Sequence, residues 1–328
     1  MNKIVITGAA GFIGSNLALF LKNEFELVLL DNFSREGSEK NTLLLLEAGL
    51  KVQTVDVSNS LQLFNFLDRV GNFESIIHLA AQTSLLESLL KPKIDFDTNA
   101  LGTLNILEFL RTQNNKCRGI FLASNKVYGN LNQYQYVESE KRYSPSSGLL
   151  AFDESLPILP IGGYSISKSI SDAYVAEYGK RYAMPVISLR QSAVYGPNQN
   201  SRSDQGWVSY FIERLNTNEE VFLRGQGKQV RDVLYIDDFL NLVKKLLVSD
   251  LQNGEVYNVG GGVHFSLSIL ELFDIFSNLT GKTLNYKTGT MAEEDQKYFV
   301  SDNTKIYKFA NWSPVISPVS GVQKLLRI

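Results

Sequence analysis

The stretch KIVITGAAGFIG, residues 3–14, decides the fold. Its first five residues are mainly β-branched and apolar, which is typical of a strand buried within a parallel sheet. The remainder reads Gly-x-x-Gly-x-x-Gly and leads into an apolar segment at residues 15–21. We expect Gly8 to turn the chain off the strand, Gly11 to admit a phosphate close to the backbone, and Gly14 to let the helix pack on the strand. The helix N-terminus would then bind a diphosphate.

A second apolar run, residues 27–30, ends in Asp31, about 20 residues after the glycines. A carboxylate there accepts hydrogen bonds from both hydroxyls of an adenosine ribose and repels a 2′-phosphate, so we predict NAD rather than NADP. Arg35 is close enough in sequence to soften this preference. The alternative is a purely structural β-turn-α unit, but a glycine motif between a strand and a helix favours the dinucleotide site.

Composition restricts the class of protein. The chain has 328 residues, 44% of them hydrophobic, 20% charged, and a net charge of −2. These values are typical of a globular protein and exclude the basic surface that nucleic-acid binding requires. The single cysteine, Cys117, cannot form an internal disulfide and suits a reducing cytoplasm, where we expect the protein. The two histidines lie far apart in sequence, so we predict no metal site.

The first 21 residues are apolar enough to imitate a secretory signal, but their glycines are spaced for a phosphate loop and Asn16 interrupts the apolar run. No apolar stretch reaches the roughly 18 residues of a membrane span. We therefore expect no membrane segment.

Strand and helix patterns alternate through the first part of the chain, which predicts an α/β fold with a Rossmann-type doubly wound parallel sheet. We assign residues 1–195 to this cofactor-binding domain, with a long polar loop at 130–163 covering the substrate side. The pattern then becomes shorter and mixed, so residues 196–328 are predicted to form a smaller mixed α/β lobe for the substrate. Residues 255–260 resemble a strand that returns to the main sheet.

Tyr164 and Lys168 are four residues apart at the start of a predicted helix, so they share one face. A free phenol titrates near about 10, too high for a base at neutral pH, and a fixed ammonium beside it would lower that pKa. Ser124 ends a predicted strand and is placed to hydrogen-bond a substrate oxygen. Although a helix-surface Tyr/Lys pair is the simpler alternative, these three residues predict a catalytic triad for hydride chemistry at a carbinol carbon.

Taken together, these features resemble the extended short-chain dehydrogenases, and among them the nucleotide-sugar epimerases and dehydratases. Further stretches resemble the CDP-paratose 2-epimerases, also called CDP-tyvelose 2-epimerases: DNFSR (31–35), SNKVYG (124–129), DQGWV (204–208), GKQVRDVL (227–234), SLSILELF (266–273), DQK (295–297) and WSP (312–314). The resemblance covers nearly the whole chain. It implies bound NAD, a CDP-linked dideoxyhexose as substrate, inversion at C2 through a transient 2-keto sugar, and a homodimer or homotetramer.

The residues expected to contact the cofactor lie mainly at strand ends and in the glycine loop: Gly8, Gly11, Phe12, Ile13, Gly14, Asp31, Asn32, Ser34, Arg35, Asp56, Val57, Leu79, Ala80, Ala81, Gln82, Asn99, Tyr164 and Lys168. Those expected to contact the nucleotide sugar are Ser124, Asn125, Lys126, Gln191, Ser192, Gln205, Trp207 and Arg231. Arg231 is our candidate for the substrate diphosphate, because a guanidinium pairs well with phosphate oxygens. A surface ion pair with Asp232 or Asp237 is the alternative.

This sequence departs from its relatives at two places that bear on the identity of the substrate and the reaction. Many relatives carry an arginine shortly before the Asp295 position, whereas this chain has Met291-Ala292-Glu293-Glu294. Dehydratases of the family place an Asp-Glu pair after the catalytic Ser or Thr, and here those positions hold Asn125 and Lys126. Since 4,6-dehydration needs a further acid and base, we predict no dehydratase activity. A UDP-hexose 4-epimerase and a non-catalytic NAD-binding regulator remain as alternatives.

Overall fold

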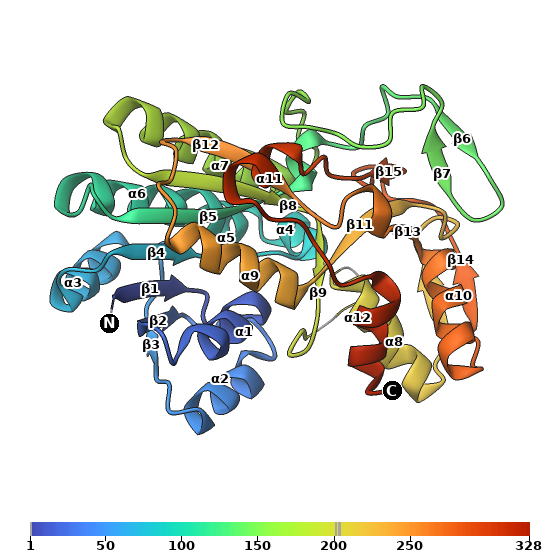
Figure 1. Ribbon diagram of the computed structural model, residues 1–328, viewed down its shortest axis with the longest axis horizontal. Coiled ribbons are helices and arrows are strands. Elements are labelled where there is room, and N and C mark those ends of the chain that lie inside the picture. Colours follow the sequence, from blue (N-terminus) through green and yellow to red (C-terminus); the bar gives the residue numbers. More distant parts are fainter. Residues whose placement is uncertain (1, 201, 203–204) are drawn as a thin grey trace.

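The computed structural model describes residues 2–200, 202 and 205–328; Asp204, in the stretch 204–208 above, lies outside them. Seven parallel strands form the central sheet in the order β12-β8-β5-β4-β1-β2-β3 (Figure 1). Their bounds are β1 (Lys3–Thr7), β2 (Glu26–Asp31), β3 (Val52–Thr54), β4 (Ser75–His78), β5 (Arg118–Ser124), β8 (Val186–Gln191) and β12 (Glu255–Val259). The predicted doubly wound parallel sheet is confirmed.

Helices cover both faces of this sheet, and each face has its own apolar core. On one face lie α1 (Phe12–Leu21), α2 (Ser38–Glu47), α9 (Ile236–Leu247) and α11 (Thr304–Ala310); on the other lie α3 (Ser60–Val70), α6 (Gly102–Gln113) and α7 (Gly163–Tyr182). Strand β1 shows how the faces divide, because Ile4 and Ile6 join the first core while Val5 joins the second. This alternation is the two-residue period of a strand.

A smaller lobe packs beside the carboxyl ends of the central strands (Figure 1). Its sheet contains β9 (Ala193–Tyr195), β11 (Val230–Tyr235), β13 (Ser266–Ser268) and β15 (Tyr298–Phe299). The lobe also contains α8 (Trp207–Thr217), α10 (Ile269–Thr280), α12 (Pro318–Leu326) and the paired strands β10 (Val221–Leu223) and β14 (Tyr286–Thr288). The shorter elements α4 (Leu85–Leu90), α5 (Pro92–Phe96), η1 (Asp97–Leu101), η2 (Asn125–Tyr128) and η3 (Val263–Phe265) link the larger ones.

The chain passes between the two parts more than once. Strand β9 precedes residue 196 but pairs with β11 in the smaller sheet. Conversely, α9, β12 and α11 follow residue 196, yet α9 packs on α1, β12 pairs with β8, and α11 packs on β12. A boundary at 195/196 therefore divides the sequence but does not separate two bodies in space.

Residues 130–163 differ from the covering loop that we expected. They include the hairpin of β6 (Tyr136–Glu138) and β7 (Tyr143–Pro145), and none of them lines the cavity described below. Their aromatic side chains pack instead on β15: Phe152 lies 5.9 Å from Phe299 between ring centroids, and its backbone N–H donates to Val300 O. This apolar packing holds the segment against the lobe, and its place on the substrate side stays a prediction.

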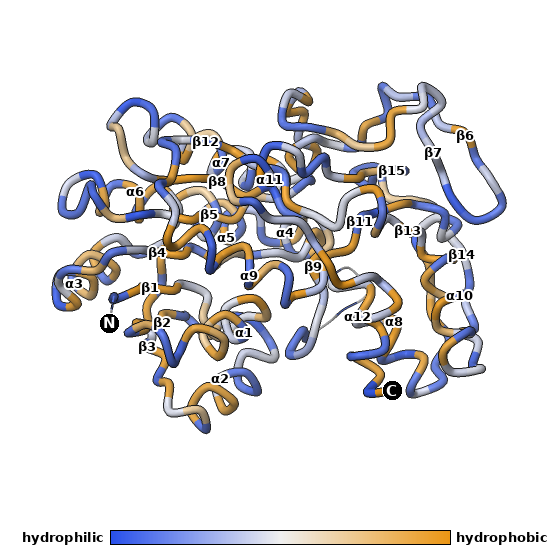
Figure 2. Tube along the Cα trace, in the orientation of Figure 1, coloured by the Kyte–Doolittle hydropathy of each residue, from blue (hydrophilic) through white to orange (hydrophobic). Residues whose placement is uncertain are grey.

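The distribution of hydropathy follows this architecture. Figure 2 shows hydrophobic residues along the central strands and hydrophilic ones at outer turns such as the β6–β7 hairpin. Among the helices of the described residues, none combines the length and apolarity that crossing a bilayer requires.

Candidate active site

A cavity of about 720 Å³ lies between the carboxyl ends of the central strands and the smaller lobe, a size typical of ligand sites. It extends from the glycine loop after β1 to Arg231 on β11. Strands β5 and β8 place Ser124 opposite Gln191 in their shared register, so both side chains reach the same edge. The order of strands reverses between β1 and β4, and ligands of doubly wound sheets bind at such a switch point.

The glycine loop has the shape that its sequence predicts. Gly8 has φ +68°, and a Cβ there would lie 2.6 Å from Ala80 N, while a Cβ on Gly14 would lie 2.2 Å from Gly8 O. Helix α1 begins after Gly11 with no side-chain cap and no acidic residue in its first turn. Uncapped N–H groups at a helix N-terminus attract anions. The loop therefore fits the diphosphate of a dinucleotide.

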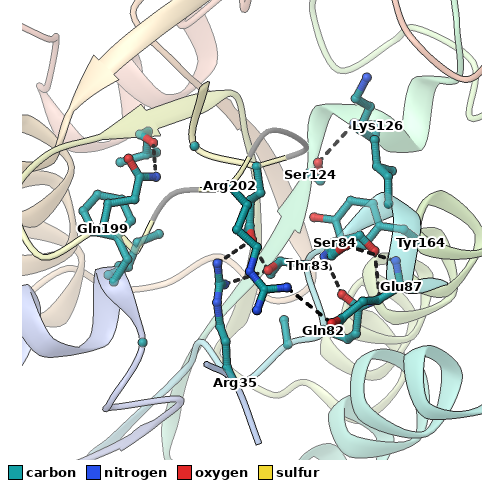
Figure 3. Close-up of a pocket in the computed structure, with 18 of the residues that line it drawn as sticks. Arg35, Gln82, Thr83, Ser84, Glu87, Ser124, Lys126, Tyr164, Gln199 and Arg202 are labelled. Carbon is teal, nitrogen blue, oxygen red and sulfur yellow. Dashed lines mark hydrogen bonds and ion pairs between the residues drawn. The ribbon is translucent and has the colours of Figure 1, made fainter. Parts of the chain in front are cut away.

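Asp31 is fixed at the edge of the same cavity by two backbone donors. Its Oδ2 accepts from Ala10 N at 2.9 Å and its Oδ1 from Phe33 N at 2.8 Å. Burial raises the pKa of the carboxyl, against these hydrogen bonds. Arg35 reaches across the cavity, where its guanidinium donates to Thr83 Oγ1 at 2.7 Å and to Gln205 (Figure 3).

Two residues predicted to contact the cofactor do not line the cavity. The Asp56 carboxylate accepts from Ser58 N at 2.8 Å and from Asn32 Nδ2 at 3.0 Å, and these bonds hold it in its own turn. Asn99 lies in the π-helical turn η1 and is 1% exposed. Its amide donates to Gln82 O, Asp95 Oδ1 and Ser167 Oγ at 3.0–3.2 Å. Both side chains are engaged by the protein, and their contacts to the cofactor stay predictions.

All the other predicted site residues line this one cavity. On the cofactor side these are Gly8, Gly11, Phe12, Ile13, Gly14, Asp31, Asn32, Ser34, Arg35, Val57, Leu79, Ala80, Ala81, Gln82, Tyr164 and Lys168. On the substrate side they are Ser124, Asn125, Lys126, Gln191, Ser192, Gln205, Trp207 and Arg231. Ser192 also has a partner within the protein, because its hydroxyl donates to buried Asp232 Oδ1 at 2.5 Å.

Ser124, Tyr164 and Lys168 come together where β5 ends and α7 begins. The Ser124 hydroxyl and the Tyr164 side chain lie near each other at the cavity wall (Figure 3), and Ser124 acts to lower the pKa of the phenol. Lys168 follows one turn later on α7, and its Nζ donates to Leu122 O at 2.8 Å. All three side chains are at least nine-tenths buried, at 7%, 8% and 6% exposed. The arrangement can hold a carbinol oxygen and exchange a proton with it.

The pKa of the Tyr164 phenol differs from the one that the sequence suggested. Burial raises the pKa of Tyr164 to about 12, while the Ser124 hydrogen bond and the Arg35 charge act in the opposite direction. Burial also lowers the pKa of Lys168 to about 8, against the attraction of Asp95 and Asp172. The expected lowering of the phenol pKa by Lys168 is therefore not found, because desolvation outweighs the nearby charges.

Sequence reasoning missed a buried polar network behind Lys168. Asp172, four residues further along α7, accepts from Arg190 at 2.7 and 3.0 Å and from Ser188 Oγ at 2.5 Å. Arg190 also donates to Tyr128 OH at 2.8 Å, and Tyr128 donates to Asn258 Oδ1 at 2.7 Å. The network ties α7 to β8, η2 and β12. Only the position of Asp172 one turn after Lys168 could have indicated it.

A second charged cluster faces the substrate side of the cavity. Asp295 Oδ1 accepts from Lys126 Nζ at 2.8 Å and from Arg231 Nη2 at 2.6 Å. Arg231 also donates to Val230 O and Gln296 O at 2.7 and 2.8 Å. Although burial alone raises the pKa of Asp295, Lys126 and Arg231 together hold it well below its usual range. The cluster joins η2 to the smaller lobe, and Arg231 pairs with Asp295 rather than with Asp232 or Asp237.

Comparison with known proteins shows the family and supports the fold. The model of the NAD dependent epimerase/dehydratase family matches residues 4–260. The CDP-paratose 2-epimerase of Salmonella typhi is 36% identical, with 98% of each chain covered. The UDP-glucose 4-epimerase of Thermotoga maritima, solved with UDP-glucose, superposes with a TM-score of 0.84 at 27% identity, covering 99% of this chain and 98% of that one.

The Thermus thermophilus UDP-glucose 4-epimerase, solved in complex with NAD, has a TM-score of 0.80 at 27% identity over 98% of this chain and 96% of its own. The fold of this chain is thus similar to that of solved epimerases over nearly its whole length. The chain belongs to the NAD-dependent epimerase/dehydratase family, whose members of this type act on nucleotide sugars.

Proposed function

We propose that this protein is an NAD-dependent epimerase that inverts C2 of a CDP-linked dideoxyhexose, interconverting CDP-paratose and CDP-tyvelose. The observation that carries the proposal is the meeting of Ser124, Tyr164 and Lys168 in one cavity with the glycine loop. The 36% identity to a CDP-paratose 2-epimerase supports the choice of nucleotide and carbon.

Each residue of the triad has a distinct task. Acceptance and return of a hydride within one turnover is the chemistry that NAD would supply when bound, with no net oxidation of the sugar. Tyr164 Oη takes the proton of the C2 hydroxyl and gives it back after the sugar has presented its other face. Ser124 Oγ holds the C2 oxygen throughout. Lys168 would hold the cofactor ribose. Without ligands the phenol pKa of about 12 is too high for a base near neutral pH, so we propose that the Lys168 ammonium stabilises the phenolate only once cofactor and substrate are bound.

The residues beside Ser124 argue against elimination of water. Asn125 Nδ2 donates to Gln296 Oε1 at 3.0 Å, and Lys126 is paired with Asp295. An amide cannot act as the acid or base that 4,6-dehydration requires, and neither position holds a carboxylate. We expect epimerisation without dehydration.

Inversion at C4 of a UDP-hexose is the second candidate, and the structural similarity to UDP-glucose 4-epimerases favours it. Incubation with CDP-paratose, CDP-tyvelose and UDP-glucose, followed by NMR of the products, separates the two. Turnover of UDP-glucose at C4 alone would refute the C2 assignment.

Replacement of the phenol tests the proton transfer. We expect Tyr164→Phe to lower kcat by a factor of about 10² to 10⁴, the usual contribution of general acid–base catalysis, while NAD content is retained. Tyr307→Phe, an exposed tyrosine on α11, is the matched control. Full turnover in Tyr164→Phe would contradict the assignment of the base. Wild-type protein that binds NAD but converts no nucleotide sugar would point to a regulator instead.

Two further expectations concern the smaller lobe and the assembly of the protein. We propose that residues 196–328 supply most contacts to the nucleotide. We also propose a homodimer or homotetramer formed through the helices that flank the sheet, because Ile166, Tyr174 and Tyr182 expose 39–46% of their surface along α7. Light scattering of the wild type and of Ile166→Lys, in which a charge enters that face, tests the second proposal.

A further inference from the structure

Lys126 follows the catalytic serine by two residues and carries its ammonium to the cavity wall at Asp295. Its own backbone N–H donates to Ser124 Oγ at 3.2 Å, so Ser124 and Lys126 share one tight turn at the end of β5 (Figure 3). The side chain is 15% exposed and lines the cavity, with its Nζ on Asp295. Burial lowers the pKa of Lys126, against the attraction of Asp295. A largely buried cation is thus carried by the same turn as Ser124, with its ammonium on Asp295.

The charges around Lys126 favour an anionic ligand. Asp295 is shared with Arg231, so the three groups leave one positive charge at the cavity wall. Glu294 also lines the cavity and is only half-buried, and its influence on Lys126 is the weakest of the neighbouring charges. A phosphate oxygen that replaced part of the Asp295 contact would gain charge-assisted hydrogen bonds from both cations.

The position of Lys126 bears on which carbon of a nucleotide sugar reacts. The diphosphate is bonded to C1, so C2 is the neighbouring carbon and C4 lies across the ring. When the C2 hydroxyl contacts Ser124 and Tyr164, the sugar-linked phosphate stays close to Ser124. When the C4 hydroxyl does so, the ring separates the phosphate from Ser124. A cation tethered to the turn of Ser124 therefore matches the first pose.

We propose that Lys126 determines the reacting carbon: it binds the sugar-linked phosphate when C2 is at the triad and so favours inversion at C2 over C4. This inference rests on the proposed nucleotide-sugar epimerase function and deepens it. Arg231 shares Asp295 Oδ1 with Lys126 and would support the same phosphate group, but it lies on β11 and not in the Ser124 turn.

One substrate can report the choice directly, because CDP-paratose carries hydroxyls at both C2 and C4. We compare the wild type with Lys126→Gln, which removes the charge, Lys126→Arg, which keeps it, and Lys228→Gln, a lysine outside the cavity that pairs with Glu138. NMR measures the C2 and C4 epimers formed. We expect Lys126→Gln to lower kcat/KM for C2 inversion about 10- to 100-fold, mainly through KM, and to lower the C2:C4 product ratio. Lys126→Arg should restore most of both, and Lys228→Gln should match the wild type.

A binding measurement separates this inference from the proposed function. Calorimetry with CDP and CMP, and with UDP and UMP in parallel, should show Lys126→Gln weakening the diphosphates about tenfold or more and the monophosphates little, because only the diphosphates carry the sugar-linked phosphate. An unchanged product ratio, or equal losses for CDP and CMP, would overturn the role of Lys126. Absence of any epimerisation by the wild type would overturn the proposed function, and with it the regiochemical role, whereas the nucleotide data would still decide whether Lys126 contacts the phosphate.

Discussion

Arg190 and Arg231 both pair with an aspartate at the carboxyl side of the central sheet, but they differ in what surrounds them. Arg190 binds Asp172 through two nitrogens and Tyr128 through a third, and it does not line the cavity. Arg231 binds Asp295 through one nitrogen, shares that carboxylate with Lys126, and lines the cavity.

The difference shows how the same pair of groups can serve packing or recognition. Around Arg190, donors and acceptors are matched within the protein, which fixes α7 against β8. Around Asp295, two cations compete for one carboxylate, so an incoming anion can be accommodated without breaking the fold. We therefore expect the first pair to affect stability and the second to affect substrate binding.

The largest effect should come from breaking the buried pair on α7. Asp172→Asn leaves the Arg190 charge buried without its counter-ion, which we expect to cost about 3–5 kcal/mol in the free energy of unfolding. Urea titration followed by circular dichroism measures this loss. Glu177→Gln, which removes an exposed ion pair with Arg181 on the same helix, should change little. Equal effects of the two variants would show that Arg190 does not depend on Asp172.

The second largest effect should come from the pair of Arg231 and Asp295, which faces the cavity. Arg231→Gln leaves Asp295 bound to Lys126, so we expect the free energy of unfolding to change by less than about 1 kcal/mol. Loss of a charge-assisted contact to the substrate diphosphate should raise KM about 10- to 100-fold. Steady-state kinetics and urea titration on the same preparation measure both quantities. A loss of stability comparable with that of Asp172→Asn would erase the distinction between the two arginines.

The smallest effect concerns Asp95, a buried carboxylate near Lys168 that accepts from Gln82 and Asn99 amides rather than from a guanidinium. Since Lys168 has a pKa of about 8, kcat/KM should fall as pH rises above about 8 and the ammonium loses its proton. The Asp95 charge favours the ammonium, so Asp95→Asn should move this alkaline limb to lower pH. Asp97→Asn, which removes an ion pair with Lys93, is the control. If kcat/KM of Asp95→Asn declines at the same pH as that of the wild type, a group other than Lys168 causes the decline.

Local patterns allowed much of the fold and of the cofactor side to be predicted. The strand, glycine turn and helix at residues 3–21 are contiguous, and Tyr164 and Lys168 are one helical turn apart, so spacing alone places them. The same reasoning did not foresee that hydrogen bonds to Ser58, Gln82 and Ser167 engage the side chains of Asp56 and Asn99. Sequence position does not reveal which polar groups the protein itself will satisfy.

Contacts between distant segments were the part that the sequence could not supply. Lys126 and Asp295 are 169 residues apart, and no periodicity relates them. The pKa of Tyr164 is a similar case, since it depends on how deeply the phenol is buried as well as on the lysine one turn away. Packing of residues 130–163 on β15 likewise depends on a strand that follows more than a hundred residues later.

The interleaved path of the chain has a consequence for the evolution of substrate choice. A fragment ending near residue 195 would lack β12, exposing the edge of β8, and would lack α9, uncovering the apolar face of α1. The C-terminal remainder would in turn lose β9 from its sheet. In a recombinant of two relatives joined at this point, β12, α9 and β9 would each have to pack on partners from the other parent. New substrates are more readily acquired by point substitutions around the cavity than by exchanging a sugar-binding cassette.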